Sequence, residues 1–143
     1  FCSPNSFHLN GDQCKAGHSN FTYDPFTLEG NFAFASAIQE MLLQSHNGLI
    51  RIFPAAPQAW KDISFTNLRT EGAFLVSATK QEGSIQSFSI TAPQGGIARI
   101  RLPFPTYVIS KSAGIKQLNS TDRTEILIQF EKGGIVQINN AFE

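Results

Sequence analysis

The feature that most constrains the fold of this 143-residue chain is a series of short segments in which apolar and polar residues alternate. A side-chain period of two is typical of a half-buried β-strand. Glycine-containing turns separate the segments, as expected for strands that follow one another in a sheet. The alternating segments are 73–79, 88–93, 98–102, 126–130 and 135–138, a short apolar strand is predicted at 49–53, and the turns lie at 81–84, 95–96 and 133–134. This pattern predicts a mainly β chain with an antiparallel sandwich-like or barrel-like domain.

One long helix is predicted ahead of the strands. Apolar residues recur at helical spacing between Phe34 and Leu42, and further apolar residues lie off this stripe. A helix that is apolar on more than one side is usually buried on both sides. Asn31 has the side chain of an N-cap. Asn47 and Gly48 are expected to end the helix, since glycine readily takes the left-handed conformation of a C-cap.

The chain is expected to divide into residues 1–48 and residues 49–143. The first part holds a long loop and the helix, and the second part is the β domain. No flexible linker separates them, and Pro54 and Pro57 fix φ at the start of the second part, which predicts a rigid junction. Because its single methionine is Met41, the chain is expected to lack the natural start of the protein.

Charge and composition exclude several classes of function. Eleven basic and eleven acidic residues balance, so no clustered positive charge points to nucleic acid. No run of about 18 apolar residues predicts a membrane span. Charged residues make up 15% of the chain, below the roughly 25% of typical domains, which favours a surface that packs against a partner. The spacing of Cys2 and Cys14 permits a disulfide without requiring one.

The first 30 residues contain several metal-ligand types, including His8 and His18, but their spacing matches no compact zinc pattern, so no metal and no cofactor is predicted. No nucleophile elbow or phosphate-binding loop is present. Glu29 precedes the predicted helix and has two readings. A carboxylate there is stabilised by the helix dipole alone, or it serves as a catalytic group.

Several motifs in order resemble the C-terminal part of glycoside hydrolase family 95, the family of α-L-fucosidases and α-L-galactosidases. The motifs are the residues Phe-Thr-Leu-Glu-Gly-Asn-Phe at 26–32, Ile-Gln-Glu-Met-Leu-Leu-Gln-Ser-His at 38–46, Phe-Pro-Ala-Ala-Pro at 53–57, Trp-Lys at 60–61 and Leu-Arg-Thr-Glu-Gly-Ala-Phe at 68–74. The resemblance covers residues 21–74 well and continues more weakly to residue 104.

The resemblance implies an inverting exo-glycosidase with its active site in an (α/α)6 barrel, followed by a C-terminal β domain. Residues 1–48 would then be the loop and last helix of an incomplete catalytic barrel. The family's general acid and its water-positioning Asn pair lie upstream of this chain. A family Asp that polarises those Asn side chains aligns with Glu29, the base-side partner here. Glu is one methylene longer, which moves the carboxylate by about 1 Å, and such a shift can lower a rate strongly.

The resemblance therefore predicts that this chain is the C-terminal portion of an α-L-fucosidase-like hydrolase and is inactive alone. Its expected partner is the missing N-terminal part of the parent enzyme. An oligosaccharide substrate is expected to bind to the whole parent enzyme. An exposed barrel edge predicts self-association of the isolated chain. A secreted or periplasmic location is expected from the family role.

The alternative is a non-catalytic carbohydrate-binding or structural β module, which would need an exposed aromatic platform. The candidates for that platform are Phe104, Tyr107 and Phe142. Trp60 is expected to fill the junction or to stack on a sugar.

Three further residues are expected to have structural roles. His46 is expected to cap or pack at the end of the helix. Arg99 and Arg101 are expected on the solvent face of a strand.

Overall fold

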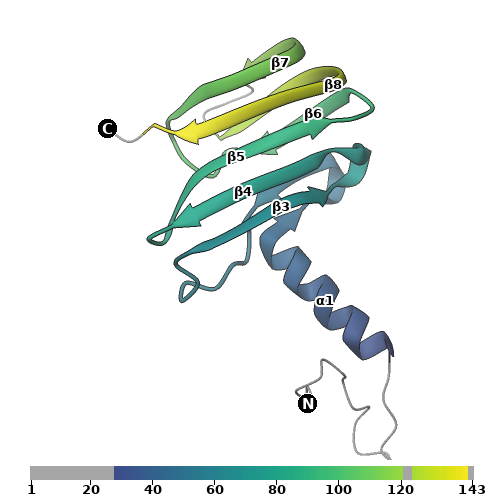
Figure 1. The fold of residues 1–143 in the computed structure, drawn as a ribbon, viewed down its shortest axis with the longest axis vertical. Coiled ribbons are helices and arrows are strands. Elements are labelled where there is room, and N and C mark those ends of the chain that lie inside the picture. Colours follow the sequence, from purple (N-terminus) through teal and green to yellow (C-terminus); the bar gives the residue numbers. More distant parts are fainter. Residues whose placement is uncertain (1–27, 121–123, 142–143) are drawn as a thin grey trace, which may run out of the picture. The chain divides into compact units, whose positions relative to one another are not determined.

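The computed structural model describes residues 28–120 and 124–141. The chain separates into two compact units, Phe1–Gln39 and Glu40–Glu143, and each is described by itself below. Most of the described residues lie in β-strands, and one long α-helix precedes them (Figure 1). The expectation of a mainly β chain with one long helix is confirmed. The predicted division at residues 48 and 49 stays a prediction.

Helix α1 spans Leu28–Leu42, so it begins and ends earlier than predicted, and Asn31 lies inside the helix and is not its N-cap. It ends early because Leu43 and Gln44 leave the helix as strand β1 (Leu43–Gln44) and pair with Ile52 and Arg51 of strand β2 (Leu49–Ile52). In the turn between them, η1 (His46–Gly48), Gly48 is left-handed as predicted, with φ of 68°, and Asn47 is left-handed as well, with φ of 58°. The Asn-Gly pair therefore forms a hairpin turn and not a helix cap.

The second unit is built on an eight-stranded sheet in the order β1-β2-β6-β8-β5-β4-β3, with β7 also paired to β8. The remaining strands are β3 (Ile63–Arg69), β4 (Leu75–Gln81), β5 (Ser84–Ala92), β6 (Gly96–Arg101), β7 (Tyr107–Ser120) and β8 (Glu125–Asn140), and a short turn η2 (Glu71–Ala73) precedes β4. All pairs are antiparallel except β2 with β6. The prediction of an antiparallel domain is wrong at this one pair.

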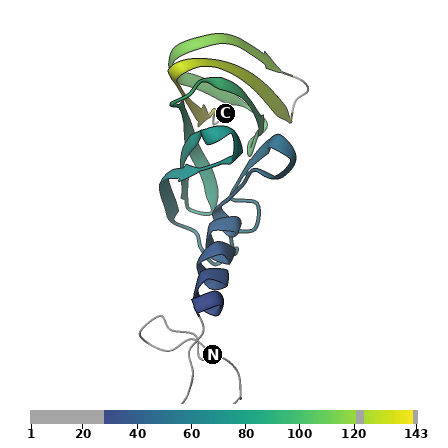
Figure 2. The same cartoon turned by 90° about the vertical axis from the view of Figure 1, so that its right-hand side faces the viewer.

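Strand β8 holds the two halves of the sheet together. Its first half pairs with β6, its second half pairs with β5, and β7 follows it along both halves. The change of partner falls at Gly133 and Gly134, so the predicted glycine turn is a bend inside one continuous strand. The sheet curls on itself at this bend and is nearly closed (Figure 2). The two expected faces of a sandwich thus belong to one folded sheet.

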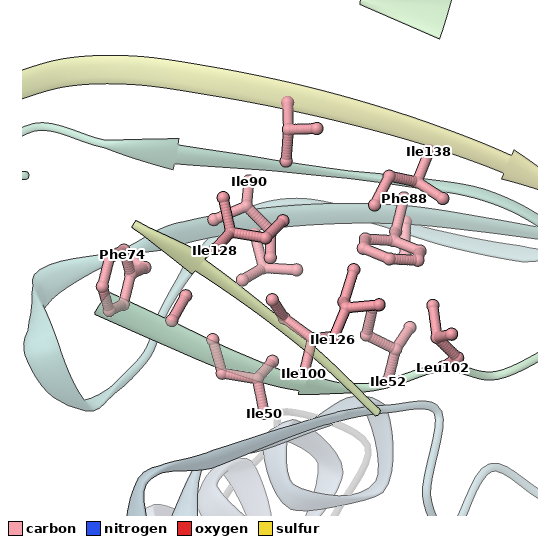
Figure 3. Close-up of a cluster of buried hydrophobic side chains, with 14 of the residues drawn as sticks. Ile50, Ile52, Phe74, Phe88, Ile90, Ile100, Leu102, Ile126, Ile128 and Ile138 are labelled. Carbon is pink, nitrogen blue, oxygen red and sulfur yellow. The ribbon is translucent and has the colours of Figure 1, made fainter. Parts of the chain in front are cut away.

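The hydrophobic core lies inside this curled sheet, where side chains from both halves meet (Figure 3). The alternation in the sequence supplies them, because every second residue of a strand points to the same face. The largest fully buried side chains are Val76, Phe88, Ile90, Ile100, Ile126, Ile128, Val136 and Ile138. Burial of such side chains contributes roughly 1.5–3 kcal/mol each and stabilises the domain.

Candidate functional site

The predicted catalytic residue, Glu29, is the second residue of helix α1. Its backbone therefore lies in the first turn, where the helix dipole stabilises a negative charge. Its side chain lies outside the described part of the structure. The position agrees with both readings of Glu29, so its assignment as a catalytic group stays a prediction.

The helix that carries Glu29 exposes large apolar side chains. Phe32 is 67% exposed and Phe34 is 56% exposed, and no charged residue occurs between Gly30 and Gln39. The sequence predicted a helix buried on more than one side. Phe32 and Phe34 are open instead, whereas Ile38, Met41 and Leu42 are half-buried.

The second unit holds an ion-pair cluster of Arg99, Arg101 and Glu125. Nε of Arg99 donates to one carboxylate oxygen of Glu125 at 2.7 Å, and Nη2 of Arg101 donates to the other at 2.6 Å. The antiparallel register places Arg101 directly opposite Glu125, with Arg99 one step further along the same face of β6. Glu125 is 5% exposed, whereas the arginine side chains are about half exposed. The arginines do lie on the outer face, as predicted, but they also cover a buried carboxylate.

These arginines control the charge of Glu125. The hydrogen bonds from Arg101 and then Arg99 lower the pKa of the carboxyl group from its ordinary value of 4.5 and outweigh burial, which acts in the opposite direction. A carboxylate held in this way stays ionised and has both oxygens occupied. The cluster therefore joins β6 to β8 and is not suited to proton transfer. Sequence reasoning missed Glu125, although an acidic residue at the start of an alternating segment is a signal for pairing with the arginines of another strand.

His46 and Trp60 were also predicted to have packing roles. Nε2 of His46 lies 2.8 Å from a carboxylate oxygen of Glu40, so His46 bridges turn η1 to the last turns of the helix, consistent with a packing role. Trp60 is 36% exposed in the loop that follows β2. Both predicted roles of Trp60 need a contact outside the described residues, so neither is tested.

The predicted aromatic platform is not formed by the described residues. Phe104 is buried, and its ring packs against Phe88 at a centroid distance of 5.9 Å. Tyr107 is half-buried against the core, and Phe142 lies outside the described residues. The prediction that Phe104 forms part of an exposed stacking surface is therefore wrong, because its side chain is buried in the core.

Residues 28–120 and 124–141 show no group of three or more His, Cys, Asp or Glu side chains able to hold a metal ion. The candidate metal ligands between residues 2 and 24, including Cys2 and Cys14, lie outside these ranges. One open depression is lined by the side chains of Asp62 and Glu82 at a hairpin end. The Asp62 carboxylate accepts the backbone N–H of Glu82 at 2.9 Å, which assigns it to the turn. No helix among the described residues is long and apolar enough to span a membrane.

The fold agrees with a comparison against known families. Residues 44–138 match the model described as "Glycoside hydrolase family 95, C-terminal domain", and this match covers more than half of the chain. The chain belongs to glycoside hydrolase family 95. The matched residues begin in strand β1 and end in β8, so the family's C-terminal domain corresponds to the curled sheet.

A curated relative adds to the family assignment. "Alpha-L-fucosidase 2" from Arabidopsis thaliana is 34% identical to this chain over 73 residues, which is 50% of this chain and 9% of the relative. The chain thus spans about a tenth of the length of that relative. The part of family 95 described by this structure is the β domain at the C-terminal side.

Proposed function

We propose that this chain is the C-terminal portion of an exo-acting, inverting glycoside hydrolase that acts on α-L-fucosides. The observation that carries the proposal is the match of the curled sheet to the C-terminal domain of family 95. The similarity to an enzyme named as an alpha-L-fucosidase supports the choice of sugar. The substrate is an oligosaccharide bound by the whole parent enzyme, and the proposal includes a secreted or periplasmic location.

In this proposal helix α1 completes the wall of a helical catalytic barrel. The exposed rings of Phe32 and Phe34 and the uncharged stretch around them support this role, because burial of such a surface stabilises a helix–helix contact. The β domain then supports the barrel from its C-terminal end. The exposed rings of Phe32 and Phe34 also lead us to expect that the 143-residue chain self-associates, which light scattering over a concentration series would detect.

Glu29 is the base-side carboxylate of the proposal. Inverting hydrolysis needs an acid on one side of the glycosidic bond and a base-activated water on the other. Glu29 cannot supply both groups by itself, and two of the described carboxylates already have other roles, since Glu125 is held between two arginines and Asp62 accepts a backbone N–H of a turn. The chain alone is therefore expected to be inactive, and the general acid is expected in the preceding part of the parent.

The test compares hydrolysis of aryl α-L-fucoside and aryl α-L-galactoside by the 143-residue chain and by the full-length parent. We expect turnover only by the full-length enzyme, with a product of inverted anomeric configuration by NMR. Glu29→Gln in the full-length enzyme should lower kcat by at least 100-fold, because the base side is lost. Glu40→Gln, on the same helix, is the matched control and should change kcat little. Turnover by the chain alone would refute the proposal, and so would an unchanged kcat in Glu29→Gln.

A further inference from the structure

The loop that follows strand β2 presents an apolar, uncharged surface to solvent. We call residues 53–60 the junction loop. Seven of its eight residues are apolar, in the sequence Phe-Pro-Ala-Ala-Pro-Gln-Ala-Trp. Most of them are exposed, and Trp60, the single tryptophan of the chain, is 36% exposed. Among exposed loops this composition is unusual, because polar and charged residues normally cover such segments.

Hydrogen bonds hold the junction loop in one shape at both ends. At its start, the N–H of Phe53 donates to the carbonyl of Leu42 at 2.7 Å, and the N–H of Ala55 donates to the carbonyl of Met41 at 3.3 Å. The Phe53 ring also packs edge-on against Phe65 at 5.2 Å. The loop is thus tied to the last residues of helix α1 and to the core.

The far end of the junction loop is held in the same way. The N–H of Trp60 donates to the carbonyl of Pro57 at 3.0 Å, and the carbonyl of Lys61 accepts the N–H of Gly83 at 3.0 Å. Two prolines fix φ inside the loop. A surface that is apolar, exposed and already rigid loses little conformational entropy when a partner covers it.

The path of the chain identifies the partner. Met41 and Leu42 are the residues through which the polypeptide enters the β domain, and their carbonyls are bonded to the junction loop itself. Whatever precedes the β domain in the parent must therefore emerge beside this loop. The Arabidopsis relative, of which this chain covers 9%, is about ten times longer than the matched segment. A large folded body is thus expected at this point.

We propose that the junction loop docks on the preceding catalytic portion of the same polypeptide, with Trp60 as the anchoring side chain. This inference rests on the proposed function, since it requires that the chain be part of a larger hydrolase. Tryptophan is among the residues that dominate binding energy when they fill a partner's pocket. A sugar is a poorer occupant, because among the side chains of the loop only Gln58 and the indole N–H of Trp60 can hydrogen-bond to hydroxyl groups.

The first experiment is hydroxyl-radical footprinting of the 143-residue chain and of the full-length enzyme. We expect the oxidation rate of Trp60 to fall at least fivefold in the full-length enzyme. The reference is Val108 on β7, which is 55% exposed and distant from the loop in sequence. An equal rate for Trp60 in both proteins would overturn the proposal. Protection of Trp60 in the short chain that grows with concentration would also overturn it, because the occupant would be a second copy.

A variant series in the full-length enzyme gives the second test. Trp60→Ala should speed the release of the β domain by limited proteolysis at least tenfold, Trp60→Phe should restore most of the resistance, and Val108→Ala should have no effect. In the short chain Trp60→Ala should leave the melting temperature almost unchanged. A large drop there would assign Trp60 to the domain's own stability and refute docking.

The fucoside assay distinguishes a failure of the docking proposal from a failure of the proposed function. Fucoside hydrolysis by the full-length enzyme together with an unprotected Trp60 would refute docking alone. Protection without fucoside hydrolysis would refute the proposed substrate alone.

Discussion

Replacing Gly134 by alanine is expected to destabilise the β domain more than any other glycine substitution at the bend of β8. A Cβ atom at this position would lie 2.5 Å from the carbonyl oxygen of Gly114 and 2.9 Å from Cδ1 of Phe130. The first contact is with the backbone of β7, and the second is with a buried ring of the core. Neither group can move without opening the β7–β8 pair or displacing core side chains.

The magnitude follows from these contacts. Overpacking a well-packed site typically costs 1–3 kcal/mol, and a clash with backbone belongs at the upper end, so we expect a loss of about 3 kcal/mol. For a domain of this size such a loss lowers Tm by roughly 10–20 °C. The neighbouring Gly133 is the matched control. Its φ is 77° and nothing lies within 4 Å of a Cβ built there, so Gly133→Ala introduces only left-handed strain of about 1–2 kcal/mol.

The assay is urea unfolding of both variants, followed by far-UV circular dichroism and extrapolated to water. A third variant, Gly134→Ala combined with Phe130→Leu, should recover little stability, because the nearest contact of the new methyl is the Gly114 carbonyl and not the ring. The reasoning is refuted if Gly134→Ala is no more destabilising than Gly133→Ala. It is equally refuted if the Phe130→Leu change restores the wild-type stability.

Three further substitutions test the core, the ion pair and the strained turn. Ile100→Ala should lower the free energy of unfolding, measured in urea, by about 2–5 kcal/mol. Ile97, on the same strand, is 60% exposed, so Ile97→Ala should change it by no more than about 0.5 kcal/mol. Similar losses in the two variants would contradict the described core. Because the pKa of Glu125 is lower in the folded state, its ionised carboxylate stabilises the fold above the unfolded-state pKa, and this stabilisation is lost as the pH falls through the folded-state pKa. Glu125→Gln should therefore flatten the acid limb of a plot of unfolding free energy against pH. An unchanged acid limb would disprove the ion-pair assignment. Ala73 has a φ of 63°, so Ala73→Gly should raise the unfolding free energy by about 0.5 kcal/mol, and a decrease would argue against the described turn η2.

The sequence predicted those features of the fold that depend only on residues close together in the chain, such as strand faces and tight turns. Alternation at 98–102 and 126–130 placed Ile100, Ile126 and Ile128 on one face, and these three side chains are fully buried. The Glu82-Gly83 turn formed as expected, with φ of 50° and 82° at the two central residues. Each of these features is decided within a few residues, because a strand period and a two-residue turn need no distant partner.

Three strands, β1, β3 and β7, were not predicted from the sequence. Strand β3 carries a register shift between Phe65 and Leu68, which breaks the alternation. Strand β7 has three register shifts against β8, and its adjacent residues Val108 and Ile109 are both exposed, so its apolar residues follow no simple period. The helix end was also misplaced, since two residues that continue a helical pattern pair with β2 instead.

The sequence by itself determined that this is a mainly β chain with one helix, which strand faces are apolar, and which family the ordered motifs resemble. Only the tertiary structure decided that β8 is shared by both halves of the sheet, that β2 runs parallel to β6, and that Glu125 joins Arg99 and Arg101 across 26 and 24 residues. The reason is physical. Burial periodicity is encoded in each segment, whereas the choice of strand partners depends on how all the apolar faces close round one core at the same time.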